Sequence, residues 1–324
     1  MSKAASPPPA TFDLRDIAPW RAGNTGIDYV TTLDSDRPGP HVMVNALTHG
    51  NEISGPRAIG FLRDHDIRPT RGRLTLSFAN VAAHARFDPA APFASRYVDE
   101  DFNRVWDPAV LDGPRHSIEL ARARQLRPIV DDVDLLLDLH STSLPMAPML
   151  LAGTRAKGLD LARGIGFPAH VVIDAGHAAG RRLRDYAAFD DPASAKAAML
   201  VECGQHFEPR AARVAIETTL RFLVHAGVIA AEVAAPHLTL EAAPQTVVRV
   251  TEAVTINSAT FAFTRPLAGF EVIPQAGTPI ARDGATEIRT PYDDCVMVMP
   301  GNDLRPGLTA VRLGRIVGAG DTTR

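Results

Sequence analysis

Residues 41–52 read HVMVNALTHGNE, an apolar run that leads directly into a histidine and a glutamate. The first part, HVMVNAL at 41–47, is typical of a short buried strand, because apolar residues dominate it and no acidic or basic group other than its first histidine interrupts it. Residues 53–65 follow with a helix-compatible pattern. A strand that enters a helix through a polar turn is the repeating unit of an α/β sheet. The stretch therefore predicts the fold class, and it places polar residues at the end of a strand.

The same alternation of strands and helices continues to about residue 232. Strand candidates lie at 73–79, 133–139, 149–152, 170–173 and 198–201, and helix candidates lie at 117–130 and 210–233. Residues 80–115 contain many Pro and Asp residues, with Gly113, and read as irregular. We therefore expect residues 11–235 to form an α/β domain, with a mostly parallel or mixed sheet and helices on both faces.

The pattern changes after Pro236. Short runs rich in Val, Thr and Ile, such as QTVVRVTEAVTI at 245–256 and CVMVMP at 295–300, are separated by Gly and Pro, and no helical period is present. This pattern predicts a small, separate all-β domain at residues 236–324. Residues 1–10, with three prolines, are expected to be a flexible tail.

Composition excludes several classes of protein. The chain has 324 residues, of which 45% are hydrophobic and 22% charged, so it can build a large core and wholesale disorder is excluded. A net charge of -3 gives no reason to expect nucleic acid as a partner. No apolar run approaches the roughly 18 residues of a membrane span, and the first residues lack a signal-peptide core. Two cysteines exclude a disulfide framework and favour a reducing compartment, so we expect a cytoplasmic protein. Homo-oligomerisation stays open.

Three of the predicted strands lead into residues that bind metal or transfer protons. His49 and Glu52 follow the strand at 41–47, His140 follows 133–139, and Glu202 follows 198–201. Because ligands collect at the carboxyl ends of the strands in α/β sheets, we expect these residues to meet although they are far apart in the chain. Each residue alone has a structural alternative: a helix start, a hydrogen-bonded histidine, or a glutamate paired with an arginine. Their joint placement after three strands favours a site.

The residue types indicate the chemistry. Two histidines and one glutamate form a ligand set known for catalytic zinc, with an open position for water, and zinc both acidifies that water and polarises a carbonyl. Glu202 then suits the role of the group that takes the water's proton and passes it to a leaving nitrogen. Asp138, in LDLH, either orients the ring of His140 or faces solvent.

A second group of polar residues lies in the irregular stretch, where residues 96–104 read RYVDEDFNR. Arg96, Asn103 and Arg104 can hold a carboxylate and a developing oxyanion. The alternative is a solvated loop whose arginines pair with the neighbouring acids. The adjacent metal pattern favours the first interpretation.

Four motifs together resemble a known family. HGNE at 49–52, RYVDEDFNR at 96–104, DLH at 138–140 and VECG at 201–204 occur in the order seen in the succinylglutamate desuccinylase/aspartoacylase family, which is related to the zinc carboxypeptidases. The resemblance covers about residues 40–232, and it implies a zinc carboxypeptidase-like fold with a β-rich C-terminal part. It also implies roles: one Zn²⁺ per chain held by His49, Glu52 and His140, Glu202 as general base and acid, Arg96 polarising the scissile carbonyl, and Asn103 with Arg104 holding the substrate's α-carboxylate.

The function implied by the resemblance is hydrolysis of the amide bond of a small N-acylated amino acid or related carboxylate. Aspartoacylases carry a further arginine shortly before the catalytic glutamate, whereas residues 190–196 here read DDPASAK. Arg181, Arg182 or Arg184, further upstream, is a candidate substitute. After Glu202 the chain reads CGQH instead of the VGP type of aspartoacylases. A carboxypeptidase acting on peptides and a non-catalytic binding protein are the alternatives, and Co²⁺ or Mn²⁺ suits the same ligands.

Three further residues near these motifs have simpler interpretations. His206, four residues after Glu202, either lines the site or has a local role, and we expect a local role for it and for His177. Cys203 follows Glu202 directly, but no histidine–asparagine pattern supports a thiol nucleophile, so we expect a packed small residue.

Overall fold

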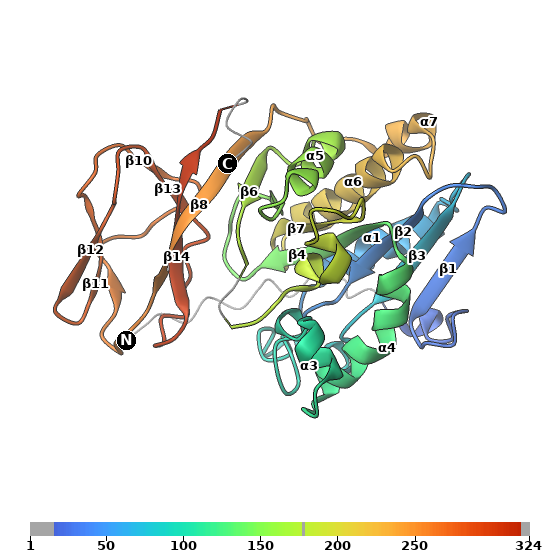
Figure 1. Cartoon of the computed structure of the whole chain (residues 1–324), viewed down its shortest axis with the longest axis horizontal. Helices are drawn as coiled ribbons and strands as arrows, with labels where there is room; N and C mark the ends of the chain where they lie inside the picture. Colours follow the sequence, from blue (N-terminus) through green and yellow to red (C-terminus); the bar gives the residue numbers. More distant parts are fainter. Residues whose placement is uncertain (1–15, 177–178, 319–324) are drawn as a thin grey trace.

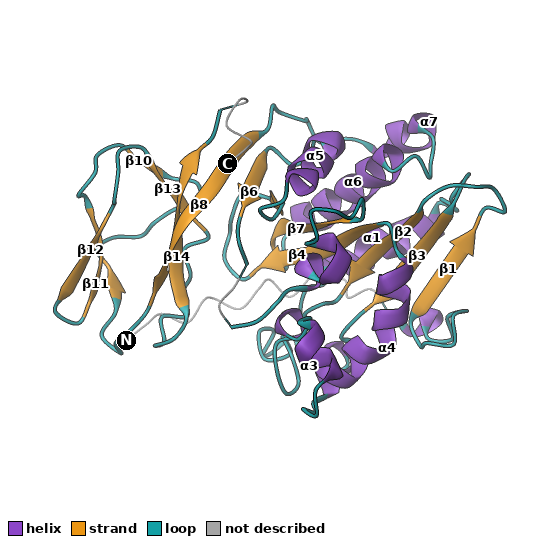
Figure 2. Ribbon diagram, in the orientation of Figure 1, coloured by secondary structure: helices purple, strands orange, loops and turns teal. Residues whose placement is uncertain are grey.

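The computed structural model describes residues 16–176 and 179–318. Within these residues, a mixed sheet of 11 strands has the order β1-β3-β2-β4-β7-β5-β6-β8-β14-β13-β10, and three short strands form a second sheet in the order β12-β11-β9 (Figures 1 and 2). The predicted tail at 1–10 and His177 lie outside the described residues.

The first seven strands form the α/β part. They are β1 (Val30–Asp34), β2 (His41–Ala46), β3 (Arg73–Phe78), β4 (Leu135–Thr142), β5 (Met149–Leu151), β6 (His170–Ile173) and β7 (Ala197–Gln205). β2 pairs in parallel with β3 and β4, and β4 pairs in parallel with β7, whereas β1 and β5 run antiparallel to β3 and β7. Every residue of β2 is buried, as expected for a strand covered on both faces. The predicted mixed α/β sheet is confirmed, and β1 is a strand that the sequence analysis did not predict.

Helices cover both faces of this sheet. They are α1 (Ser54–Asp64), α2 (Val81–His84), α3 (Pro108–Asp112), α4 (Ile118–Asp132), α5 (Ala156–Ile165), α6 (Pro209–His225) and α7 (Ala231–Ala234), with 3-10 turns η1 (Ala18–Trp20), η2 (Phe102–Arg104), η3 (Leu183–Asp185), η4 (Ala187–Phe189) and η5 (Ala235–His237). Apolar residues of α1, α5 and α6 share one core cluster with Val42 and Val44, and those of α4 share another with Met43. Since successive strand residues point to opposite faces, the two clusters lie on the two sides of β2. No helix among the described residues is long and apolar enough to cross a membrane.

Two boundaries differ from the predictions. The helix expected at 210–233 ends at His225, because Gly227 adopts the left-handed conformation (φ 70°), and the separate α7 follows. The strands expected to end before His140 and Glu202 instead continue through them, because these two residues are paired in register between β4 and β7. Both side chains therefore belong to the rigid sheet and not to loops.

The C-terminal part is built from strands and turns: β8 (Thr246–Thr255), β9 (Ala262–Phe263), β10 (Val272–Ile273), β11 (Pro279–Asp283), β12 (Thr286–Arg289), β13 (Cys295–Val298) and β14 (Thr309–Ile316). It has its own core cluster, which includes Val254, Ile280 and Met297. β8 pairs in parallel with β6, and β14 pairs antiparallel with β8. The main sheet is thus continuous from the α/β part into the β-rich part (Figure 1).

Candidate active site

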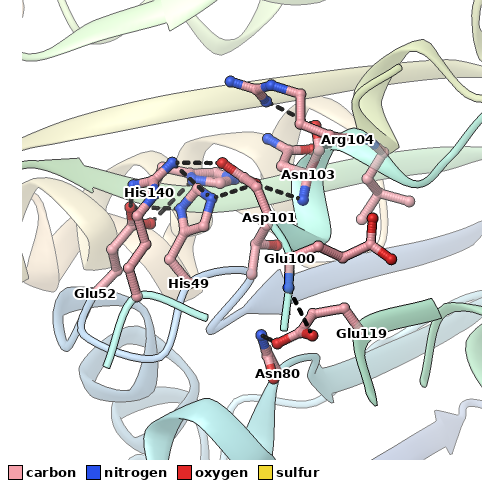
Figure 3. Close-up of polar contacts among 12 residues, drawn as sticks. His49, Glu52, Asn80, Glu100, Asp101, Asn103, Arg104, Glu119 and His140 are labelled. Carbon is pink, nitrogen blue, oxygen red and sulfur yellow. Dashed lines mark hydrogen bonds and ion pairs between the residues drawn. The ribbon is translucent and has the colours of Figure 1, made fainter. Parts of the chain in front are cut away.

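Two histidines and one glutamate converge in the interior. His49, Glu52 and His140 are buried, and one possible ligand atom from each lies within 4.8 Å of the others. Nδ1 of His49 is 2.7 Å from Oε1 of Glu52, and Nδ1 of His140 is 2.9 Å from Oε2 (Figure 3). Burial alone would raise the pKa of Glu52, but the two histidines lower it well below its ordinary value. The arrangement is a buried carboxylate faced by two ring nitrogens, which could hold a metal ion.

A glycine in this turn brings the second motif close. A Cβ on Gly50 would lie 2.4–2.5 Å from backbone atoms of Ala83, His84 and Ser95, so only glycine allows the turn to pack against that segment. The N–H of Gly50 donates a hydrogen bond to the carbonyl of Arg96 (3.0 Å). The short HGNE motif therefore positions two side chains that could bind a metal and also holds Arg96 beside them.

Two aspartates orient the histidine rings. Nε2 of His140 is 2.8 Å from Oδ2 of Asp138, whose Oδ1 accepts hydrogen bonds from Asn45 Nδ2 and Thr48 Oγ1, each 2.8 Å long. Asp138 is fully buried, so the structure shows the ring-orienting option and excludes the solvent-facing one. Nε2 of His49 is 3.0 Å from Oδ1 of Asp101. When each Nε2 carries the proton donated to its aspartate, each Nδ1 is free to bind a metal.

Glu202 stands beside the candidate metal ligands, on the strand next to that of His140. It is the register partner of His140, and its side chain is buried, with Oε2 accepting no hydrogen bond among the described residues. Burial raises the pKa of Glu202 to about 8; the charge of His140 opposes this shift and the nearby charge of Glu52 adds to it. A carboxyl group of this kind can hold or release a proton near neutral pH.

The loop at 96–104 supplies the cationic groups. Nη2 of Arg96 donates to Oδ2 of Asp101 (3.0 Å), and Nη1 lies 3.7 Å from Oε1 of Glu52, so this arginine reaches the ligand triad while it pairs with an acid of its own loop. Asn103 is buried, and its Oδ1 accepts a hydrogen bond from the N–H of Leu183 (2.9 Å). Its Nδ2 group donates no hydrogen bond to another of the described residues. Burial lowers the pKa of Arg104 to about 10, against the opposing charge of Asp101.

A buried glutamate that the sequence analysis missed holds this loop. Glu119, in the first turn of α4, is fully buried and accepts hydrogen bonds from the backbone N–H groups of Val98, Asp99 and Glu100 and from Nδ2 of Asn80 (Figure 3). An acidic residue in the first helical turn usually faces solvent and complements the helix dipole, so its sequence position gave no signal of this role. Asp101 was missed as an orienting group, although its place inside the 96–104 motif was a usable signal.

The triad, Glu202 and the cationic groups line one cavity of about 310 Å³. All seven predicted site residues border it: His49, Glu52, Arg96, Asn103, Arg104, His140 and Glu202. His206 also borders it, with Nδ1 2.8 Å from Oγ of Ser141, so the expectation of a merely local role was wrong for this residue.

Cys203 is buried, as expected for a packed residue, and burial raises the pKa of its thiol well above the ordinary value. The β-rich part adds Thr309 and Arg312 of β14 and the segment 299–303.

Comparisons with known proteins agree with this architecture. Residues 38–267 match the family model described as "Succinylglutamate desuccinylase/Aspartoacylase catalytic domain". A stretch of 130 residues is 37% identical to a "Probable aspartoacylase" of Parasynechococcus marenigrum (strain WH8102), covering 37% of this chain and 40% of that protein. Another alignment, of 119 residues, is 31% identical to "N-acyl-aromatic-L-amino acid amidohydrolase (carboxylate-forming) A" of Danio rerio, covering 34% of this chain and 35% of that protein. The chain thus matches well under half of the length of these two relatives.

Solved structures show the same fold. The crystal structure of succinylglutamate desuccinylase/aspartoacylase from Rhodobacter sphaeroides superimposes with a TM-score of 0.65 over 89% of each chain, at 19% sequence identity. The family model covers most of the chain, including all four motifs and the whole ligand triad. This chain belongs to the succinylglutamate desuccinylase/aspartoacylase family.

Proposed function

We propose that the protein is a zinc-dependent hydrolase that cleaves the amide bond of a small N-acylated amino acid or related carboxylate. The observation that carries the proposal is one cavity in which the buried triad of His49, Glu52 and His140 stands beside Glu202, a carboxyl group able to hold a proton near neutral pH. Membership of the family and the names of the two curated relatives, an aspartoacylase and an amidohydrolase, support the reaction class.

The residues present fit one zinc ion per chain. Oε2 of Glu52 is buried and accepts no hydrogen bond of acceptable geometry, although Nδ1 of His140 is 2.9 Å away. A buried carboxylate oxygen that faces ring nitrogens without a hydrogen bond is the position in which a cation is expected, and two imidazoles with one carboxylate suit zinc. Zinc held there would lower the pKa of a water molecule and polarise the amide carbonyl. Co²⁺ and Mn²⁺ are the other candidates for the same ligands.

The chain's own groups supply binding and proton transfer. Arg104 and the Nδ2 group of Asn103 would bind the α-carboxylate of the substrate; both residues border the cavity, and a guanidinium binds carboxylates strongly. Arg96, which reaches the triad, would donate to the carbonyl oxygen as negative charge develops on it. Glu202 would accept a proton from the attacking water and then deliver it to the leaving nitrogen, two steps that need a carboxyl pKa near neutrality.

A mass-spectrometric screen tests the proposal. The zinc-loaded protein and a metal-stripped control are incubated with a panel of N-acyl amino acids and short peptides. We expect metal-dependent release of a free amino acid from one or more N-acyl amino acids. Trimming of peptides alone would replace the proposal with a carboxypeptidase, and bound zinc without turnover of any compound would favour a binding protein.

One substitution tests the mechanism. Glu202→Gln keeps the shape of the side chain but removes the proton acceptor, so we expect it to bind zinc and to lose turnover by roughly 10²–10⁴-fold. Glu208→Gln, at the exposed N-cap position of α6, is the matched control. Near-normal turnover by the Glu202→Gln variant would refute the assigned role.

The two cysteines of the chain are buried and unpaired, and on this basis we propose that the enzyme works in the cytoplasm.

A further inference from the structure

A buried histidine in the cavity has no role in the proposed mechanism. His206, directly after β7, is only 3% exposed and borders the active-site cavity. After burial, the groups that act most strongly on its pKa are the charges of Glu52 and Arg96, so the ring lies at the end of the cavity that holds the triad. Because an unpaired buried polar group is costly, each nitrogen of this ring needs a partner.

The sheet fixes the backbone of His206. In the ladder between β4 and β7 the register shifts, so that one residue of β4, Ser141, faces two residues of β7, Cys203 and Gly204. Gly204 has a φ of 108°, a left-handed conformation that favours glycine. The N–H of His206 then donates to the carbonyl of Thr142 (2.9 Å). A bulge of this kind redirects the side chains that follow it, so the rigid sheet determines where His206 points.

Three side chains fix the ring itself. Nδ1 of His206 is 2.8 Å from Oγ of Ser141, and the ring centroid lies 5.5 Å from that of Phe207 and 6.1 Å from that of Phe93. His206 also borders a second cavity, between α1 and α6, whereas Ser141 borders the active-site cavity alone of the two. The two nitrogens of an imidazole lie on one edge, on either side of Cε1. The edge that meets Ser141 therefore turns Nε2 toward the active site.

The contact with Ser141 decides which nitrogen carries the hydrogen. Ser141 is buried, and its hydroxyl has no other hydrogen-bond partner in residues 16–176 and 179–318, so this hydroxyl is satisfied only when it donates to Nδ1 of His206. A neutral imidazole that accepts at Nδ1 carries its hydrogen at Nε2. Burial keeps the ring neutral, since it lowers the pKa of His206 to about 4. Nε2 donates no hydrogen bond to another described residue, so the cavity receives an unused neutral donor.

Arg96 shares its own donors with carboxylates of the chain. Its Nη2 donates to Oδ2 of Asp101 (3.0 Å), and its Nη1 lies 3.7 Å from Oε1 of Glu52. Donors fixed in advance around a developing oxyanion stabilise it most. The N–H of a neutral imidazole adds such a donor without a further charge, and it does not release its proton near neutral pH, so it does not compete with Glu202 in proton transfer.

We propose that His206 is a further catalytic residue, whose Nε2–H donates a hydrogen bond to the carbonyl oxygen of the scissile amide as negative charge develops on it. The inference rests on the proposed function, which supplies that amide. Ser141, Phe93 and Phe207 are positioning residues for this donor. Because the hydrogen bond strengthens as the charge develops, its loss lowers kcat more than it changes KM.

Two substitutions that differ by one donor test the proposal in the zinc-loaded enzyme, with an N-acyl amino acid that it cleaves. The amide nitrogen of a glutamine reaches about the position of Nε2, whereas that of an asparagine reaches only the position of Nδ1. We expect His206→Asn to lower kcat by roughly 10²–10³-fold with KM within about 3-fold of the wild type, and His206→Gln to recover at least about 10-fold of that loss. His116→Asn, at an exposed position, is the control and should match the wild type.

The comparison excludes a packing role. Equal losses of kcat in His206→Asn and His206→Gln overturn the proposal, because neither amide replaces the ring that packs against Phe93 and Phe207. A kcat of the wild-type size in His206→Asn, or a loss confined to KM, overturns it as well.

Measurements without turnover separate this inference from the proposed function. Acetohydroxamate presents a carbonyl oxygen beside a metal-binding group, and calorimetry with the zinc-loaded protein should show an affinity about 10-fold or more lower in His206→Asn and less reduced in His206→Gln. If no amide is cleaved but acetohydroxamate binding follows this order, the proposed function fails and the donor stands. If amides are cleaved but neither kcat nor this affinity distinguishes the two variants, the donor fails. Nitrogen-15 NMR of the wild type needs no variant to fold: hydrogen on Nε2 of His206 is expected, and hydrogen on Nδ1 overturns the proposal.

Discussion

Replacing Asp138 with asparagine should weaken metal binding and leave the fold in place. Oδ1 of Asp138 accepts two hydrogen bonds, from Asn45 and Thr48, so the amide oxygen of an asparagine must take that position. Its NH₂ group then faces Nε2 of His140, which is 2.8 Å from the present Oδ2. Two donors cannot share that contact, so the imidazole must move its proton to Nδ1. Nδ1 is the nitrogen that faces Glu52, and once protonated it cannot bind a metal ion.

The structure sets the size of the effect. Loss of a buried carboxylate that orients a histidine ligand typically weakens metal binding by about 10–100-fold, which corresponds to roughly 1.4–2.7 kcal/mol. The forced change of tautomer at His140 places Asp138→Asn at the upper end of that range or beyond it. The metal-free fold keeps a hydrogen bond at each of the three contacts, so its free energy of unfolding should fall by only about 1 kcal/mol.

The assay is zinc affinity by competition with a chelator, together with chemical unfolding of the metal-free protein. Asp160→Asn, an exposed change of the same kind in α5, is the control and should behave as the wild type. Zinc affinity of Asp138→Asn equal to that of the wild type would refute the reasoning, because the orientation of His140 would then not depend on the carboxylate. A large loss of stability in the metal-free state would show instead that Asp138 mainly supports the fold.

Three further predictions follow from particular contacts. Gly50→Ala adds a methyl group that would lie 2.4–2.5 Å from three backbone atoms. We therefore expect the free energy of unfolding, measured in urea, to fall by about 1–3 kcal/mol and zinc binding to weaken. An unchanged free energy of unfolding would contradict the close packing of this turn. Glu119→Gln leaves fewer acceptor sites for the three backbone N–H groups of the 96–104 loop. We therefore expect kcat/KM to fall by roughly 10-fold while the zinc content stays constant. A kcat/KM equal to that of the wild type would show that the loop does not depend on this carboxylate. Burial alone would raise the pKa of Asp174, but the guanidinium groups of Arg182 and Arg312 lower it below its ordinary value. The Asp174 carboxylate therefore stabilises the fold fully above about pH 4 and loses that contribution as the pH falls through its folded pKa. The difference in free energy of unfolding between wild type and Asp174→Asn should therefore shrink between pH 7 and pH 3, and a constant difference would be inconsistent with this linkage.

The elements that could be predicted are those with a local, periodic signal. The buried strands β2, β4 and β7 appear as apolar runs because helices cover both of their faces, and α1 and α4 appear close to their predicted positions. The sequence predicted the ends of these strands less well than their presence. His140 and Glu202 are polar residues that usually end an apolar strand, and only their pairing in adjacent strands keeps both inside the sheet.

The groups that orient the candidate ligands were harder to predict from the sequence than the candidate ligands themselves. Asp138 could be read in two ways because its burial depends on Asn45 and Thr48, which come from another strand and turn. No sequence pattern indicated the role of Glu119. The four N–H groups that donate hydrogen bonds to its carboxylate belong to Asn80, which is distant in the chain, and to residues 98–100 of an irregular loop. Such contacts depend on which segments the fold brings together, and spacing along the chain does not record that.

The sequence by itself determined the fold class and the residue types of the candidate site, because each motif is short and follows its own strand. The tertiary structure alone decided how these motifs are combined: the parallel pairing of β4 with β7 sets Glu202 beside His140, and the pairing of β8 with β6 extends the sheet far enough for β14 to bring Arg312 into the cavity. The physical reason is that strand order and register are set by long-range hydrogen bonding and packing of the whole sheet, whereas the local pattern of side chains specifies only that a strand or a helix forms.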